Sequence, residues 1–140
     1  MDNRLQETNF IIYKTKDGNV SVDVILKDET IWITQKGMAE LFECSTDNIG
    51  LHLKNIYLEK EWVKKATTEK ISVVRDEGNR QVKRTLEFYN LDAIIAVGYR
   101  VNSKKATQFR IWATNILKEY MIKGFVIDKE KMNRLLMIFR

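Results

Sequence analysis

Hydrogen-bonding side chains gather in the segment of residues 45–55, and their types suit contacts with a polyanion. Asn48 is the candidate base contact, because an asparagine amide can bond adenine twice in the major groove of DNA. Serine and threonine hydroxyls more often bind phosphate, which is the role expected of Ser45 and Thr46. The candidate contacts in this segment are Ser45, Thr46, Asn48, His52, Lys54 and Asn55.

A second candidate site is the stretch of residues 100–110, which contains four cations and no acid. Such a cluster can hold phosphate groups, and free backbone N–H groups at the start of a helix near residue 104 would add to an anion site. The cations are Arg100, Lys104, Lys105 and Arg110. The alternative is a solvated face whose charge is balanced by acids elsewhere.

The tip of a predicted hairpin, residues 75–84, carries four further cations and could follow a DNA groove as a β-wing. Asp76 and Glu77 weaken that interpretation. Together with Lys83 they could also be arranged as in a nuclease, but charges of this kind are common at hairpin tips. No phosphate-binding glycine loop or Ser/His/Asp set occurs, so we expect no enzymatic activity.

The sequence lacks the residues that a metal site or a catalytic thiol requires. The chain has one cysteine, Cys44, and one histidine, His52, whereas a zinc site takes three or four ligands. A single cysteine also excludes an internal disulfide. We therefore expect neither a metal nor a cofactor. Tryptophans 32, 62 and 112 are expected to be core or interface anchors rather than base-stacking residues.

The first candidate set lies in a predicted helix-turn-helix, residues 34–57. Thr34 is typical of an N-cap, and Ser45 or Thr46 can cap the second helix. Apolar residues recur at helical spacing in both helices, and Ala39 allows the helices to approach closely. These apolar residues are Met38, Leu41 and Phe42 in the first helix, and Ile49, Leu53 and Ile56 in the second.

The remaining pattern predicts an α+β fold with two β-hairpins, one on each side of the helix-turn-helix in sequence. Strands are expected over residues 10–13 and 20–26, with a short third strand at 31–33 completing a small N-terminal sheet. A mostly polar connector, 59–68, leads to the second hairpin, whose strands 70–75 and 81–89 flank a turn at 76–80.

The C-terminal region, residues 90–124, is predicted to be helical. Asn90 is expected to cap a helix that ends near residue 102, and a longer helix follows from 104 to 123, stopped by Gly124. A last short helix is expected over 127–139, with Asp128 as its cap. The chain is interpreted as one domain spanning residues 1–140.

Bulk properties fit a cytoplasmic protein that does not enter a membrane. Hydrophobic residues make up 44% of the 140 positions, the net charge is +5, and the N-terminus lacks the apolar core of a signal peptide. No apolar run approaches the roughly 20 residues that span a bilayer. The moderate basic excess is compatible with a nucleic-acid partner.

Three separated motifs, spread over about residues 10–130, resemble the N-terminal half of the virulence-associated RhuM family. They are Ile33-Thr34-Gln35 with Met38–Phe42, Asn48-Ile49 and His52–Ile56; Phe88–Val101; and Ala106–Thr114 with Leu117–Tyr120 and Lys123–Phe125. The resemblance implies a bacterial protein of pathogenicity islands or mobile elements, with a DNA-binding domain like that of phage antirepressors. It also implies that relatives usually continue beyond this length, and the tail 132–140 matches none of the motifs.

These observations predict a regulatory protein that binds double-stranded DNA, with residues 45–55 as the reading helix and a homodimer as the candidate assembly. The alternative is a protein-interaction or homodimerisation module without DNA binding. In that interpretation the apolar run of residues 135–139 docks a partner or a second copy.

Overall fold

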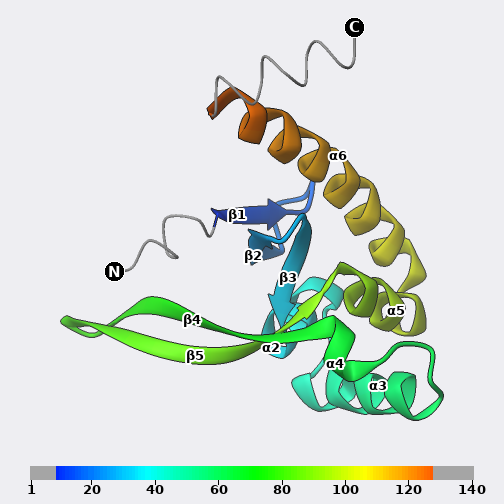
Figure 1. The fold of residues 1–140 in the computed structure, drawn as a ribbon. Helices are drawn as coiled ribbons and strands as arrows, with labels where there is room; N and C mark the ends of the chain where they lie inside the picture. Colours follow the sequence, from blue (N-terminus) through cyan, green and yellow to red (C-terminus); the bar gives the residue numbers. More distant parts are fainter. Residues whose placement is uncertain (1–8, 128–140) are drawn as a thin grey trace, which may run out of the picture.

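The computed structural model describes the backbone of residues 9–127 and the side chains of residues 10–121. Five strands and five helices follow one another in this part of the chain (Figure 1). They are β1 (Asn9–Lys14), β2 (Ser21–Lys27), β3 (Thr30–Thr34), α2 (Gln35–Phe42), α3 (Thr46–Leu58), α4 (Lys64–Thr67), β4 (Thr68–Glu77), β5 (Arg80–Asn90), α5 (Leu91–Val101) and α6 (Ser103–Ile127). The predicted α+β class is confirmed.

Two hairpin turns rest on glycines with positive φ. Gly18, between β1 and β2, has φ 76°, and Gly78, between β4 and β5, has φ 65°. Residues with a side chain adopt this backbone only with strain. The second turn is tighter than the predicted turn at 76–80, because β4 runs to Glu77 and β5 begins at Arg80. A two-residue turn that starts on glycine matches the strand twist, so pairing continues to both strand ends.

All five strands belong to one antiparallel sheet, in the order β1-β2-β3-β5-β4. The sequence predicted a small N-terminal sheet and a second hairpin, but it did not predict that the two join into one sheet. Trp32, Ile33 and Thr34 of β3 pair with Asn90, Tyr89 and Phe88 of β5. This ladder joins residues more than fifty positions apart, and no local turn signal reports a pairing at that distance.

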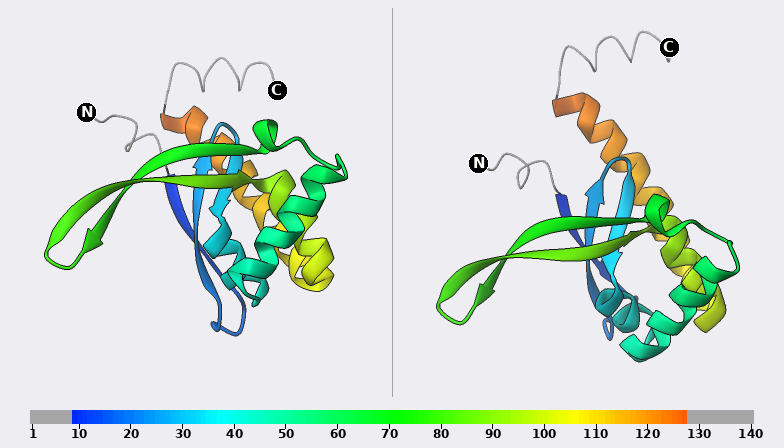
Figure 2. Two further views of the ribbon diagram at one scale, coloured as in Figure 1. Left: turned by 90° about the horizontal axis from the view of Figure 1, so that it is seen from below. Right: turned by 60° about the horizontal axis from the view of Figure 1, so that its bottom comes forward.

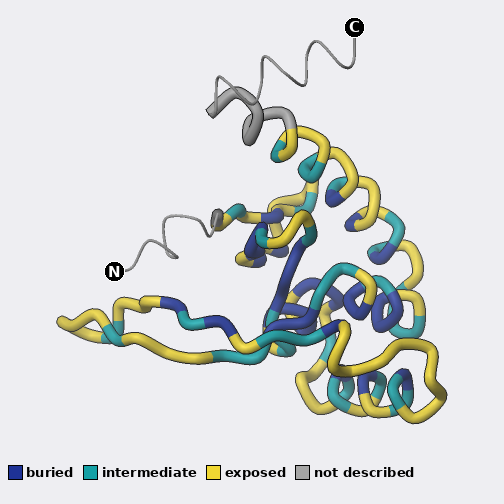
Figure 3. The backbone as a smooth tube through the Cα atoms, viewed as in Figure 1, coloured by how far each residue is buried: buried dark blue, intermediate teal, exposed yellow. Residues whose placement is uncertain are grey.

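The main core lies between one face of the sheet and the helices. Buried side chains come from the N-terminal strands, α2, α3, α5 and α6, and Figure 3 shows them on β3 and on the inner sides of the helices. In this core, the Tyr13 ring packs edge to face against Phe109, with ring centroids 5.1 Å apart, and against Trp112, with centroids 4.9 Å apart. Such aromatic contacts add about 1 kcal/mol each beyond area burial. These contacts pack α6 against β1.

A second, smaller cluster lies on the other face of the sheet. Ile25, Trp32, Ile71, Val73 and Phe88 are buried there. The sequence pattern places Ile25 among the polar, outward positions of β2, yet its side chain is 1% exposed. The reason is the long β4–β5 hairpin, because its residues Ile71 and Val73 belong to the same cluster as Ile25. This hairpin projects from the body and bends (Figure 2).

Three predicted caps are confirmed. The side-chain oxygens of Thr34, Ser45 and Asn90 accept hydrogen bonds from the backbone N–H groups of Gly37, Asn48 and Ala93, respectively. These bonds satisfy donors that the first turn of a helix leaves free. The helices α2, α3 and α5 therefore begin where the sequence predicts.

Two helical predictions are wrong. Helix α6 continues through Gly124 to Ile127, because glycine permits a left-handed stop without enforcing one. The predicted connector 59–68 contains the one-turn helix α4. The helix expected over 127–139 and the apolar run 135–139 lie beyond the described residues. Among the described helices, none is long and apolar enough to cross a bilayer.

The turn between β2 and β3 holds two non-glycine residues in the left-handed region. Asp28 has φ 55° and Glu29 has φ 60°. Glu29→Gly is expected to raise the free energy of unfolding by about 1 kcal/mol, since that backbone costs a side chain roughly 1–2 kcal/mol. Chemical denaturation measures this.

Ser21→Gly is the matched control, because Ser21 is exposed within regular β2. It is expected to lower stability by about 0.5–1 kcal/mol. Equal losses in the two variants would contradict the assigned strain.

Candidate nucleic-acid interface

Helix α3 follows α2 after the short segment Glu43–Ser45. Glu43 has φ 57° and ends α2, and Ser45 then caps α3 with its side-chain oxygen 3.0 Å from the Asn48 nitrogen. The Gln35 amide donates to the Thr46 carbonyl at 2.7 Å, which ties the start of α3 to the start of α2. Ser45 is thus the structural cap of α3, and it stays exposed.

The solvent face of α3 differs in composition from the predicted one. Asn48, His52 and Asn55 are half-buried along its sides, whereas Lys54 is exposed. The outer face also carries Leu51 and Leu58, which are 55% and 68% exposed. Among the predicted contacts on the helix, Thr46 and Lys54 are the exposed ones.

Sequence reasoning missed these two leucines as surface residues. Each lies two positions from a buried isoleucine, Ile49 or Ile56. Because an α-helix has 3.6 residues per turn, a separation of two places side chains on nearly opposite sides. The helical period therefore contained the signal that places Leu51 and Leu58 on the outer face.

In the basic stretch 100–110, two of the four predicted cations are held by carboxylates. Arg100 Nη2 lies 2.7 Å from Glu59 Oε1 and 2.9 Å from Glu61 Oε1. Lys105 Nζ lies 2.7 Å from Glu43 Oε2. Glu43 precedes α3 and Glu59 follows it, so the corner between α5 and α6 reaches both ends of α3.

The other two cations of that stretch are exposed. Arg110 Nε donates to the Tyr99 hydroxyl oxygen at 3.2 Å, and this hydrogen bond is the main reason why the pKa of Tyr99 is lowered. Lys104 forms no ion pair with any described residue. Lys104 and Arg110 are therefore available to a phosphate without first leaving an acid.

The β4–β5 hairpin extends away from the body, and its outer half is mostly exposed (Figures 2 and 3). Arg84 is bound by Glu77 through two hydrogen bonds of 3.0 and 2.7 Å, which lower the pKa of Glu77. Arg75, Arg80 and Lys83 are exposed and form no ion pair among the described residues. The hairpin thus presents three cations that are not neutralised there.

The charged residues considered for a nuclease site, Asp76, Glu77 and Lys83, do not form one site. Asp76 and Glu77 are consecutive in β4, so their side chains point to opposite faces of the hairpin. Glu77 is also occupied by Arg84. Across the described part of the chain, no three His, Cys, Asp or Glu side chains are close enough to hold a metal ion.

Comparison with known proteins gives one match. The family model described as "Virulence protein RhuM family" matches residues 66–138, slightly more than half of the chain. The match includes β4, β5, α5 and α6 and leaves out α2 and α3, so it is shorter than the resemblance seen in the sequence. No curated protein and no solved structure matches significantly.

Arg100 lowers the pKa of Glu59, mainly through its hydrogen bond. Because the folded-state pKa lies below the ordinary value, the pair contributes stability above that value, and this contribution is lost as the pH falls through the lowered pKa. Arg100→Gln is expected to return the pKa of Glu59 toward the ordinary glutamate value. Carboxyl NMR titration measures it.

Glu77 is the internal control for this titration, because its partner is Arg84. Its pKa is expected to be unchanged by Arg100→Gln. If Glu59 titrates identically in the two proteins, the Arg100 ion pair does not form in solution.

Proposed function

The chain belongs to the virulence protein RhuM family, and we propose that it is a regulatory protein of a bacterial mobile element that binds double-stranded DNA. Helix α3 is the reading helix, in a helix-turn-helix with α2. The β4–β5 hairpin acts beside it as a wing. The protein binds without catalysing a reaction.

One observation carries this proposal, namely the order of elements around α3. Strand β3 is followed by α2, α3 and then the hairpin, and β3 pairs with the second hairpin strand, β5. A winged helix-turn-helix has this arrangement. It supports a groove-binding role because one α-helix fits the major groove while a neighbouring hairpin contacts the backbone.

The available charges support the same role. Lys54 is exposed on α3, and the hairpin adds the cations Arg75, Arg80 and Lys83. Lys104 and Arg110 supply further phosphate contacts. Arg100 and Lys105 can join them only by leaving their carboxylates, so we assign them a weaker contribution. Ser45 and Thr46 hold phosphate, and Asn48, His52 and Asn55 contact DNA from the sides of α3.

The second candidate function is homodimerisation or protein interaction, and the exposed Leu51 and Leu58 favour it. A dimer would also double the DNA contacts, since two half-sites would be bound together. Removal of the chain from Asn133 onward tests the apolar run 135–139 as the dimer contact. Loss of the dimer with retained DNA binding would separate the two functions, and no change in either would exclude that run.

DNA affinity is expected to fall steeply with salt, and the slope of log K against log salt counts the phosphate contacts. Lys54→Ala and Lys83→Ala should each reduce this slope by about 1. Lys118→Ala is the control, because Lys118 is an exposed residue in the C-terminal half of α6, a segment that lies far from α3 in Figure 1. Affinity that does not change between about 50 and 200 mM salt would exclude electrostatic DNA binding.

Asn48→Ala is expected to change the preferred DNA sequence, because a bidentate amide contributes about 1–3 kcal/mol of discrimination between bases. The Ser45 cap is retained in this variant, since Asn48 takes part in it through its backbone N–H. Selection of bound DNA from a random pool measures the preference. Asn115→Ala, an exposed position on α6, is the control, and identical selected sequences for both variants would exclude base reading by Asn48.

A further inference from the structure

Nine consecutive residues, from the last residue of α3 into α4, are exposed, and we name residues 58–66 the connector surface. It includes Trp62, whose side chain is 38% exposed, and Val63, which is 63% exposed. Trp32, by contrast, is 6% exposed in the second cluster. Exposed aromatic side chains close together with other apolar groups mark binding surfaces. The connector surface is therefore typical of a binding site.

The connector surface has a defined backbone. Lys60 has φ 62°, its N–H donates to the Tyr57 carbonyl at 3.2 Å, and the Glu61 N–H donates to the Ile56 carbonyl at 3.0 Å. These two bonds are the Schellman ending of a helix. At the other end, Thr67 Oγ1 donates to the Val63 carbonyl at 3.0 Å. Trp62 is thus presented between two hydrogen-bonded turns.

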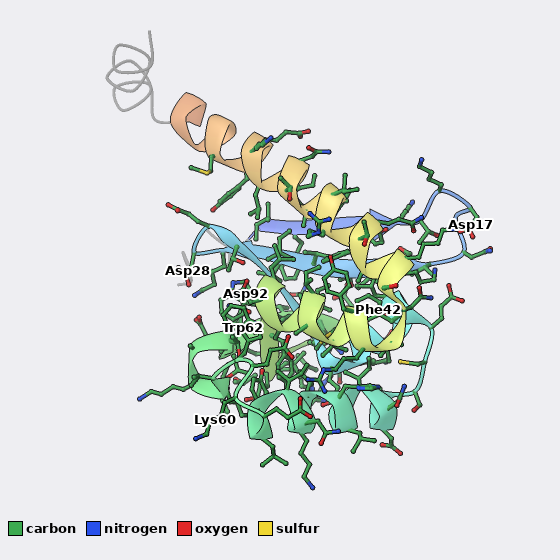
Figure 4. All side chains as sticks on the ribbon, turned by 90° about the vertical axis from the view of Figure 1, so that its right-hand side faces the viewer. Asp17, Asp28, Phe42, Lys60, Trp62 and Asp92 are labelled. Atoms are coloured by element: carbon green, nitrogen blue, oxygen red, sulfur yellow. The ribbon has the colours of Figure 1, made fainter. Side chains whose placement is uncertain are left out.

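The charges of the connector surface are unequally compensated. Both of its acids, Glu59 and Glu61, bind Arg100. Its lysines, Lys60, Lys64 and Lys65, are exposed and form no ion pair with a described residue. Three lysines without an ion pair to a described residue therefore lie within three positions of Trp62 in the sequence. Figure 4 labels Lys60 and Trp62 in this segment, at the end of α3.

We propose that the connector surface binds an unpaired base of DNA. The Trp62 ring stacks on the base, and the three lysines hold the neighbouring phosphates. Aromatic rings flanked by cations are how proteins bind single-stranded nucleic acid, because every base offers a flat face to a ring. This inference rests on the proposed DNA binding and extends it, since the preferred substrate becomes a duplex that adjoins an unpaired segment.

Tryptophan fluorescence tests the stacking directly. A thymidine oligonucleotide of about 16 nucleotides is added to the full chain, and quenching is expected. Trp62→Phe should abolish this quenching while Trp32 and Trp112 still emit. An unquenched wild-type protein overturns the proposal. Absence of quenching with a blue shift that grows with protein concentration would instead assign the surface to a second copy of the chain.

Affinity for the labelled oligonucleotide separates stacking from other effects. Trp62→Ala should weaken binding about 5- to 150-fold, which corresponds to the loss of one stacked base, and Trp62→Phe should retain most of the affinity. Val63→Ala, the matched exposed neighbour, should change affinity less than about twofold. Equal losses for Trp62→Ala and Val63→Ala contradict base stacking, as does an equal loss on a fully paired duplex.

The two proposals fail separately. Oligonucleotide binding without duplex binding would exclude the reading role of α3 and leave the connector surface assigned. If Trp62→Ala also lowers the melting temperature, the double variant Lys64→Gln/Lys65→Gln tests the proposal instead. Losing two phosphate contacts to a single strand should reduce the slope of log K against log salt by about 1.4. An unchanged slope overturns the proposal.

Discussion

The three-residue ladder between β3 and β5 is the constraint on which the rest of the fold depends. It makes one sheet from the N-terminal strands and the long hairpin. Both strands also end at helix caps: Thr34 closes β3 and caps α2, and Asn90 closes β5 and caps α5. The pairing therefore sets where α2 and α5 leave the sheet, and it places α3 beside the base of the hairpin.

Close contact between helices then determines how α3 is supported. A Cβ atom at Gly98 would lie 2.6 Å from Phe42 Cζ and 2.7 Å from Ala106 Cβ, so α5 meets α2 and α6 with no room for a side chain. Phe42 and Ala106 are fully or almost fully buried. Glycine at this position allows the three helices to share one core, and Ile49, Leu53 and Ile56 of α3 bury against it.

The sequence predicted what is encoded locally. Caps at Thr34, Ser45 and Asn90 and turns at glycine are set by neighbouring residues, and the helix and strand types followed. Burial of Ile25 was missed because it depends on the distant hairpin, and the Arg100 ion pairs were missed because their partners lie about forty residues away. The candidate site shows the same division: residue types indicated cations, while packing decided which cations are neutralised.

The ion pairs around α3 act on the electric field more than on stability. Solvent screens exposed ion pairs, so Arg100 and Lys105 add little to the free energy of unfolding. They do pair with Glu43, Glu59 and Glu61 at the two ends of α3, where two cations offset two of the three negative charges. Residues 58–66 contain three lysines and two glutamates, a net charge of +1, and Arg100 raises the local net charge to +2. The ion pairs therefore leave the lysines as the unpaired charges of the connector surface, which favours a polyanion.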